Sequence, residues 1–309
     1  MISRVLFLVL IIAVAGCSTA PDNQKAEQPA VSPATTPAAP AAQDDAKWAV
    51  TEGINAPESV YIDAEDGFIF VSNIGGAPDQ RDGNGYISKL GPDGKVIAIQ
   101  WVTGFNAPKG LRSYKGTLWT ADLDEVVSID IASGKVASRV KIDGAKFLND
   151  VACGSDGTVY VSDTVGNRIY AVKNGKASVF AEGDDIEYPN GLLVEGDKLV
   201  VAGWGKPEAD FTTKVPGRLF TLDLKTKTKK KTLITPEPFG NTDGIESDGQ
   251  GGYIVSDYMA GTIKQVGADG KATVVKQLKQ GSADIAYVPA QKLVIVPQMS
   301  ENKIAAYTF

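Results

Sequence analysis

The chain has 309 residues, with 31 Lys and Arg against 37 Asp and Glu, and a formal net charge of −6 at neutral pH. This negative balance argues against nucleic acid as a partner. The sequence contains no histidine, which excludes Ser-His-Asp and Cys-His nucleophilic mechanisms and imidazole zinc ligands. Any chemistry must therefore use carboxylates, amides, Lys, Tyr or a hard metal ion.

The first residues predict an export signal. A short positive segment, Met1 to Arg4, precedes an apolar run of residues 5–15, which fits a signal peptide and is too short for a bilayer span of about 20 residues. Small residues then lead directly into Cys17, which resembles the lipobox of bacterial lipoproteins. We therefore expect residues 1–16 to be a lipoprotein signal peptide and Cys17 to be lipidated, or else an ordinary signal peptide with a chance cysteine.

The lipid predicts the location of the protein. Ser18 rather than Asp follows the cysteine, which favours anchoring to the outer membrane of a diderm bacterium, facing the periplasm. Residues 17–45 are rich in Ala, Pro, Thr and Gln and cannot bury a core. Fully extended, they would reach about 85 Å. We expect a disordered tether here and a folded domain over residues 46–309, in which Cys153 is an inert core residue.

One five-residue pattern occurs six times in the folded part. Each copy lies at the start of an apolar strand and has a polar residue at its third position. The spacings between these third positions are 51, 40, 41, 53 and 41 residues. Periods of about 40–50 residues without a helical pattern predict propeller blades. The six segments are Ala56–Val60, Ala107–Leu111, Phe147–Val151, Tyr188–Leu192, Asn241–Ile245 and Ser282–Ala286.

The strands that follow predict how the ring closes. Five segments are followed by three further strands and the sixth by only two, so Trp48–Glu52 is expected to supply the missing strand. We predict an all-β, monomeric six-bladed β-propeller with four-stranded blades, the last blade closed by the N-terminal strand. Two long loops, Asn73–Gly85 and Gly203–Gly217, lie in opposite blades and are expected to roof a pocket, or else to be tolerated surface insertions.

The third positions are expected to converge at one mouth of the central channel. They carry three acids, two amides and a lysine, and their oxygens suit Ca²⁺, which takes 6–8 oxygen ligands. Three carboxylates and one ammonium leave two negative charges, which one Ca²⁺ would neutralise. The residues are Glu58, Lys109, Asn149, Asn190, Asp243 and Asp284.

Over roughly residues 47–309 these motifs resemble the senescence-marker-protein/gluconolactonase/luciferin-regenerating (regucalcin-like) family and, more distantly, paraoxonase and diisopropylfluorophosphatase. In that family a Glu, two Asn and an Asp from four inner strands bind a divalent ion, usually calcium. The resemblance implies Ca²⁺, or else Mg²⁺, Mn²⁺ or Zn²⁺, bound by four residues. The matching motifs are Pro57-Glu58, Leu148-Asn149-Asp150, Pro189-Asn190-Gly191-Leu192 and Asp243-Gly244-Ile245.

The family reaction is hydrolysis of lactones or related esters. The resemblance implies that the ion polarises the carbonyl and that Asp243 is catalytic, either as general base for water or as direct nucleophile. We therefore expect an exported, lipid-anchored, Ca²⁺-dependent hydrolase with a small ester or lactone substrate. The alternative is a non-catalytic propeller that binds a protein or envelope ligand on its top face.

Lys109 departs from the family pattern, because an ammonium cannot coordinate a cation. It could pair with Glu58 or Asp284, bind an anionic group of the substrate, or occupy the place of the metal. Asp284 has no family role either, and is expected to support the ligands or to pair with Lys109. Trp204 and Phe211 in the second long loop are expected to contact substrate, together with Lys109 and Asp284. Three further acids are expected to make structural hydrogen bonds only: Asp122, Asp163 and Asp257.

Overall fold

Strands make up nearly all of the regular structure, in six antiparallel sheets of four strands each. The computed structural model describes residues 45–226 and 229–309, and the predicted signal peptide, Cys17 and nearly all of the predicted tether lie outside them. Helix within these ranges is limited to three short 3₁₀ turns, η1 (Asp184–Ile186), η2 (Pro289–Gln291) and η3 (Met299–Glu301). No helix in the described part has the length and hydropathy needed to cross a bilayer.

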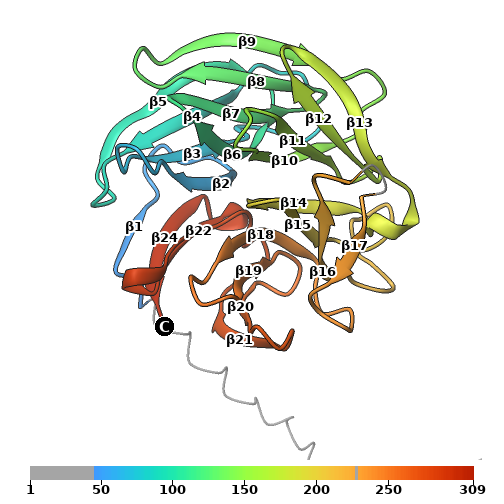
Figure 1. Ribbon diagram of the computed structural model, residues 1–309. Coiled ribbons are helices and arrows are strands. Elements are labelled where there is room, and N and C mark those ends of the chain that lie inside the picture. The colour runs from blue at the N-terminus through green and yellow to red at the C-terminus, as the bar shows by residue number, and fades with distance from the viewer. Residues whose placement is uncertain (1–44, 227–228) are drawn as a thin grey trace, which may run out of the picture. The chain divides into compact units, whose positions relative to one another are not determined.

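The six sheets are the blades of a propeller, with the first strand of each blade toward the middle (Figure 1). Blade 1 consists of β2 (Pro57–Ile62), β3 (Ile69–Asn73), β4 (Gly85–Leu90) and β5 (Val96–Phe105). Blade 2 consists of β6 (Pro108–Tyr114), β7 (Thr117–Asp122), β8 (Glu125–Asp130) and β9 (Lys135–Lys141). Blade 3 consists of β10 (Leu148–Cys153), β11 (Val159–Asp163), β12 (Arg168–Lys173) and β13 (Lys176–Glu182). Blade 4 consists of β14 (Pro189–Glu195), β15 (Lys198–Gly203), β16 (Leu219–Asp223) and β17 (Lys231–Leu233). Blade 5 consists of β18 (Thr242–Ser247), β19 (Tyr253–Asp257), β20 (Thr262–Val266) and β21 (Ala272–Gln277). Blade 6 is β22 (Ala286–Val288), β23 (Leu293–Gln298), β24 (Lys303–Thr308) and β1 (Trp48–Val50). The predicted six-bladed all-β fold is confirmed.

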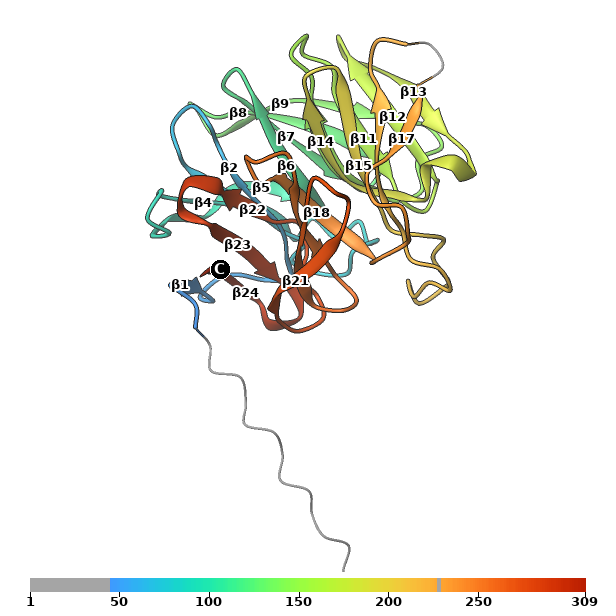
Figure 2. The same ribbon diagram turned by 60° about the horizontal axis from the view of Figure 1, so that its bottom comes forward.

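The N-terminal strand closes the last blade, as predicted. β1 pairs antiparallel with β24, placing Trp48 opposite Ala306 and Val50 opposite Ile304. Figures 1 and 2 both show β1 beside β24, next to the C-terminus. Without β1, β24 would present unpaired N–H and C=O groups along an open edge. The strand ends at Val50 and a turn follows, so it is shorter than the predicted Trp48–Glu52.

Burial falls from the channel to the rim. β11 is buried at all five positions, whereas β9 is exposed at six of seven. The sheets stack on one another, so an inner strand has a neighbouring blade on each of its faces. Its sequence is therefore a continuous apolar run rather than an alternation of apolar and polar residues. One such core joins blades 1 and 2 through Phe70, Phe105 and Leu111.

A β-bulge at the start of each inner strand positions the candidate site. In blade 2, Pro108 pairs with Asp122 but Leu111 pairs with Thr120, so one extra residue stands between them. Such a bulge re-aims side chains. The third repeat residue points to the channel mouth, and the fourth faces a neighbouring inner strand. A Cβ on Gly110, a fourth residue, would lie 2.2 Å from Asp150 Oδ1, so only glycine fits there.

The predicted register of the sixth repeat is wrong by one residue. Ser282 pairs with Gln298 as Thr242 pairs with Asp257, which puts Ala283 at the third position and Asp284 at the fourth. Parallel pairing of inner strands fixes this register, since Asp284 N–H donates to Glu58 O (2.9 Å) and Val60 N–H donates to Asp284 O (3.1 Å). The sequence pattern predicted the wrong register because the acidic residue of this blade stands at the fourth repeat position, whereas the other blades carry their polar residue at the third.

Candidate functional site

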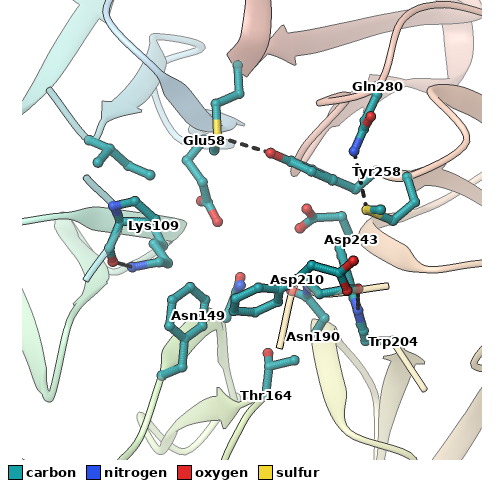
Figure 3. Close-up of a pocket in the computed structure, with 16 residues that line it drawn as sticks. Glu58, Lys109, Asn149, Thr164, Asn190, Trp204, Asp210, Asp243, Tyr258 and Gln280 are labelled. Atoms are coloured by element: carbon teal, nitrogen blue, oxygen red, sulfur yellow. Dashed lines mark hydrogen bonds between the residues drawn. The ribbon is translucent and has the colours of Figure 1, made fainter. Parts of the chain in front are cut away.

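A cavity of about 270 Å³ lies at the channel mouth (Figure 3). Five third-position residues line it: Glu58, Lys109, Asn149, Asn190 and Asp243. Both long loops contribute walls, Ile74 and Pro78 from the first and Trp204, Asp210 and Phe211 from the second. The prediction that the two loops roof a pocket is confirmed.

Four buried oxygens at the floor of this cavity have no hydrogen-bond partner among the described residues. They are Glu58 Oε2, Asn149 Oδ1, Asn190 Oδ1 and Asp243 Oδ1. Their side chains come from four different blades and point toward one common space (Figure 3). Leaving a buried acceptor unpaired costs about 1–3 kcal/mol, so four together call for a shared partner.

The chemistry of this set fits a hard cation. All four atoms are carboxylate or amide oxygens, the ligands that Ca²⁺ prefers, and no nitrogen or sulfur ligand is among them. No group of three or more His, Cys, Asp or Glu side chains in the described ranges is placed to hold a metal ion. The set at the floor is not a group of that kind, because only two of its four members are carboxylates, Glu58 and Asp243, and the other two are amides.

Burial disfavours the ionised form of both floor acids. Burial raises the pKa of Glu58 well above its usual value, the charge of Asp243 raises it further, and Lys109 partly opposes both effects. Burial likewise raises the pKa of Asp243, with contributions from Asp284 and Asp257. A cation among these oxygens would favour the ionised forms instead.

Lys109 points away from the four oxygens (Figure 3). Its Nζ donates to the carbonyls of Pro78 (3.1 Å) and Ala107 (3.2 Å) and lies 4.5 Å from the ring centroid of Phe147. It forms no salt bridge within 4.0 Å with a described carboxylate, so the predicted ion pair with Glu58 or Asp284 is absent. It does not occupy the metal position either. Two carbonyls and an aromatic face satisfy the buried ammonium locally, while burial lowers its pKa.

Asp284 does not line the cavity, and its predicted place at the mouth is wrong. Its Oδ2 accepts a hydrogen bond from Ser59 Oγ at 2.5 Å, and the residue is 2% exposed. It shares a lower layer with Asp150, whose pKa burial raises to about 7 despite the nearby charge of Arg112. The mouth therefore carries one negative charge fewer than the predicted register gave.

An aromatic wall stands above the floor. Trp204 and Phe211, which the sequence predicts to contact substrate, line the cavity, and Trp204 Nε1 donates to Phe211 O at 3.0 Å. Ring centroids are 5.4 Å apart for Phe147 and Phe211, 6.4 Å for Phe211 and Trp204, and 5.8 Å for Trp204 and Tyr258. The wall is thus continuous from blade 3 to blade 5.

Sequence reasoning missed several of the lining residues, although the repeats carried a signal for them. The residue directly after the second strand lines the cavity in five of the six blades, blade 2 being the exception. These residues are Ile74, Thr164, Trp204, Tyr258 and Met299. The inner end of the second strand lies at the mouth, so the next residue reaches the cavity whatever its type.

Three acids at second-strand ends have the structural role predicted for them. Asp122 accepts from Ala107 N–H at 2.8 Å, Asp163 from Phe147 N–H at 2.8 Å, and Asp257 from Ala260 N–H at 3.1 Å. In blades 2 and 3 these bonds hold the segment that leads into the inner strand. Cys153 is partly buried against the core that Val151, Val159 and Val161 share, and burial raises the pKa of its thiol to about 12.

No family model and no curated protein sequence matches the chain. Solved structures match its fold. A gluconolactonase from Xanthomonas campestris aligns with a TM-score of 0.64 at 14% identity over 84% of this chain and 88% of that one. A calcium-binding protein, regucalcin, from Agrobacterium tumefaciens aligns with a TM-score of 0.58 at 16% identity, over 81% and 88%. A catalytically inactive virginiamycin B lyase variant from Staphylococcus aureus, with quinupristin, gives 0.56 at 13%, over 85% and 98%.

Proposed function

We propose that this propeller binds a divalent cation, most simply Ca²⁺, at the channel mouth and hydrolyses lactones or related esters there. Glu58, Asn149, Asn190 and Asp243 would hold the ion. The observation that carries the proposal is the convergence of four unpaired, buried oxygens from four blades. Gluconolactonase and regucalcin among the structural neighbours support the same assignment.

Different groups around the floor would supply the Lewis acid, the base and the positive charge that hydrolysis uses. When bound, the ion supplies a Lewis acid for the ester carbonyl. Asp243 takes a proton from a water whose oxygen bonds to the acyl carbon. The bond between the acyl carbon and the ring or alkoxy oxygen breaks, and the proton passes to that departing oxygen. Lys109 lines the same cavity with its Nζ held by two backbone carbonyls and the Phe147 ring, so its positive charge, rather than a free donor, would favour the carboxylate of the product.

A lyase reaction is a weaker candidate. The virginiamycin B lyase neighbour is a catalytically inactive variant in which a histidine is replaced by alanine. The present chain contains no histidine, so it lacks the side chain type on which that enzyme depends. The carboxylates and amides at the floor suit water attack on an ester instead.

Two measurements test the assignment. The protein is stripped with chelator and melted while Ca²⁺ is added; at 100 times its Kd the ion should stabilise it by about 2.7 kcal/mol. Asp243→Asn should lower kcat for a simple lactone by at least about 100-fold while the fold persists. Asp143→Asn, an exposed acid, is the matched control. No shift with Ca²⁺, Mg²⁺, Mn²⁺ or Zn²⁺, or full activity without the Asp243 carboxylate, contradicts the proposal.

The role of Asp243 as base rather than nucleophile has its own test. A single turnover in ¹⁸O-water should place the label in the product acid when water attacks directly. If Asp243 attacked instead, it would form a mixed anhydride with the acyl group and release the alkoxy oxygen. Water attack on the aspartyl carbonyl of this anhydride would then place the label in Asp243 and leave an unlabelled enzyme oxygen in the product. Mass spectrometry of the product separates the two outcomes.

We further propose that the protein acts as a monomer at a membrane surface, anchored by lipid on Cys17 after export, on the periplasmic side of an outer membrane. The Val-Ala-Gly-Cys sequence before the tether supports this proposal. Mass spectrometry of the mature N-terminus should find diacylglycerol on Cys17, and Cys17→Ser should release the protein from the membrane fraction. Unmodified Cys17 in the mature chain would contradict the anchor.

A further inference from the structure

The walls of the cavity differ chemically from its floor. Together with the four oxygens, the cavity is lined by four aromatic side chains, those of Phe147, Phe211, Trp204 and Tyr258. Figure 3 shows Trp204 and Tyr258 beside Asp243. Two thioethers, Met259 and Met299 of blades 5 and 6, also line it. Aromatic rings and thioether sulfur both pack favourably against another ring. The floor is therefore the polar end of the cavity, and the walls offer contacts for an apolar group.

Most polar groups on the walls already have hydrogen-bond partners, and the Asp210 carboxylate, which accepts from Thr212 through Oδ1, is the exposed exception. Trp204 Nε1 donates to Phe211 O, and Thr164 Oγ1 donates to Pro189 O at 2.9 Å. Tyr258 donates its hydroxyl hydrogen to Met299 Sδ (3.4 Å), and Gln280 Nε2 approaches Met259 Sδ (3.5 Å). A substrate hydroxyl placed against these walls would have to break such a bond or stay unpaired. Each unpaired hydroxyl lowers affinity on the order of tenfold.

The size of the cavity admits a ring beside the reacting group. An engineered protein cavity of about 150 Å³ with apolar walls binds benzene. The cavity here is about 270 Å³ and opens to solvent at the mouth. A phenyl group and a five-membered lactone ring can therefore be placed together, with the ester at the floor and the phenyl group against the wall.

We propose that the substrate is a lactone or ester that carries an aromatic ring, recognised by the wall of Phe147, Phe211, Trp204 and Tyr258. This inference rests on the proposed hydrolysis at the floor. It distinguishes the protein from an enzyme for polyhydroxylated sugar lactones, because the walls leave few free partners for a row of hydroxyls. Phe211 is the central specificity residue, since its ring lies between those of Phe147 and Trp204.

The activity test compares three lactones on the Ca²⁺-loaded protein. We expect kcat/KM for γ-phenyl-γ-butyrolactone to exceed that for γ-butyrolactone by about tenfold or more, the effect of burying one phenyl ring, and glucono-1,5-lactone to be the poorest. Phe211→Ala should reduce the preference for the phenyl compound about fivefold, as expected for losing an aromatic pair. Phe180→Ala removes a half-buried ring outside the cavity and should leave that preference unchanged.

A binding test separates failure of this inference from failure of the proposed reaction. The probe is 3-phenylcyclopentanone, which has no ester to hydrolyse. Trp204 is the only described tryptophan that lines the cavity, so saturable quenching of tryptophan fluorescence should accompany binding and vanish in Trp204→Phe. Isothermal titration of that variant should still detect the probe, with Phe211→Ala weakening it about fivefold.

The outcomes are distinct. Binding of the phenyl ketone without turnover of any lactone would sustain the aromatic site and overturn the proposed reaction. Turnover with glucono-1,5-lactone as the best substrate would sustain the reaction and overturn the aromatic class. Absence of ketone binding to the Ca²⁺-loaded protein, by both fluorescence and titration, would also overturn it.

Discussion

Acidic residues in the channel occupy two layers with different surroundings. Glu58 and Asp243 face the cavity with unpaired oxygens. Asp150 and Asp284 lie one residue further along their strands, where Asp150 accepts from Leu192 N–H (2.6 Å) and Asp284 accepts from Ser59 Oγ. Asp284 Oδ1 also lacks a partner among the described residues, but Asp284 does not line the cavity. The upper pair is therefore available to a ligand there, whereas the lower pair joins neighbouring inner strands.

The lower layer predicts a stability effect without an activity effect. Ser59→Ala removes the hydroxyl that donates to Asp284 and should lower the free energy of unfolding by about 1–3 kcal/mol, the cost of an unpaired buried acceptor. Urea unfolding measures this, with the exposed Ser178→Ala as control. KM for lactone should stay within about twofold, because neither residue lines the cavity. A changed KM with unchanged stability would show that this assignment of roles is wrong.

The position of Lys109 predicts that its positive charge weakens cation binding at the floor. Its ammonium is buried near Glu58 and is held by backbone carbonyls rather than by an acid. Its charge and that of Glu58 interact, so it also opposes a second positive charge at the floor, by an amount on the order of 1 kcal/mol. Lys109→Met should tighten Ca²⁺ binding at least severalfold by calorimetric titration, and the exposed Lys135→Met should not. Weaker binding in Lys109→Met would mean that the ammonium assists the site.

At the scale of elements, the blade-4 loop Gly203–Gly217 is anchored at its base by a cluster around Glu187. That carboxylate accepts hydrogen bonds from Arg218 Nε (3.0 Å) and Lys231 Nζ (2.6 Å), and also from Arg218 N–H (3.1 Å). Gly217 N–H in turn donates to Gly240 O at 2.9 Å. The loop that carries Trp204 and Phe211 is thus held at its return point by charge-assisted bonds.

This cluster predicts a pH-dependent contribution to stability. Burial by itself raises the pKa of Glu187, but the bonds from Arg218 and Lys231 outweigh it and lower the pKa below its usual 4.5. A lowered folded-state pKa stabilises the protein above about pH 4.5, and this contribution is lost as pH falls through the folded value.

Glu187→Gln should therefore cost about 1.5–3 kcal/mol at pH 7, and the difference from the unsubstituted protein should shrink below pH 4.5. Chemical unfolding at both pH values measures it. Glu52→Gln, an exposed acid outside the cluster, should show neither effect. A cost that stays constant with pH would contradict the role given to the Glu187 charge.

For the whole molecule, blades 6 and 1 are joined at two radii. Near the channel, Ser59 and Asp284 form a parallel bridge between the inner strands. At the rim, β1 completes blade 6, and its Trp48 and Val50 pack on the core that β2, β3 and β23 share. Chain segments at least 225 positions apart thus meet twice, so the closed ring depends on both ends of the described chain.

Removing the rim contact predicts a loss of both stability and solubility. A chain starting at residue 52 lacks β1, and should lose at least about 3 kcal/mol from the burial of Trp48 and Val50. It should also associate through the open edge of β24. Thermal melting and light scattering measure the two effects against a chain starting at residue 45. Equal stability and a monodisperse monomer for the shorter chain would show that β1 is dispensable.

The repeats determined the blade number, the closure by Trp48 and the oxygen-rich character of the mouth, because each depends on local spacing and residue type. Four candidate ligands fell at equivalent places in four blades, and the bulge that aims them recurs with the repeat. These features need no knowledge of which blade touches which.

Tertiary contacts decided the rest. The register of Asp284 depends on pairing with Ser59 across the ring closure, and the direction of Lys109 depends on carbonyls at Pro78 and Ala107. The aromatic wall joins residues from three blades. A pattern in one strand specifies which side chains it carries, but the partners that orient a buried charge or a ring lie on other strands, and only folding brings them together.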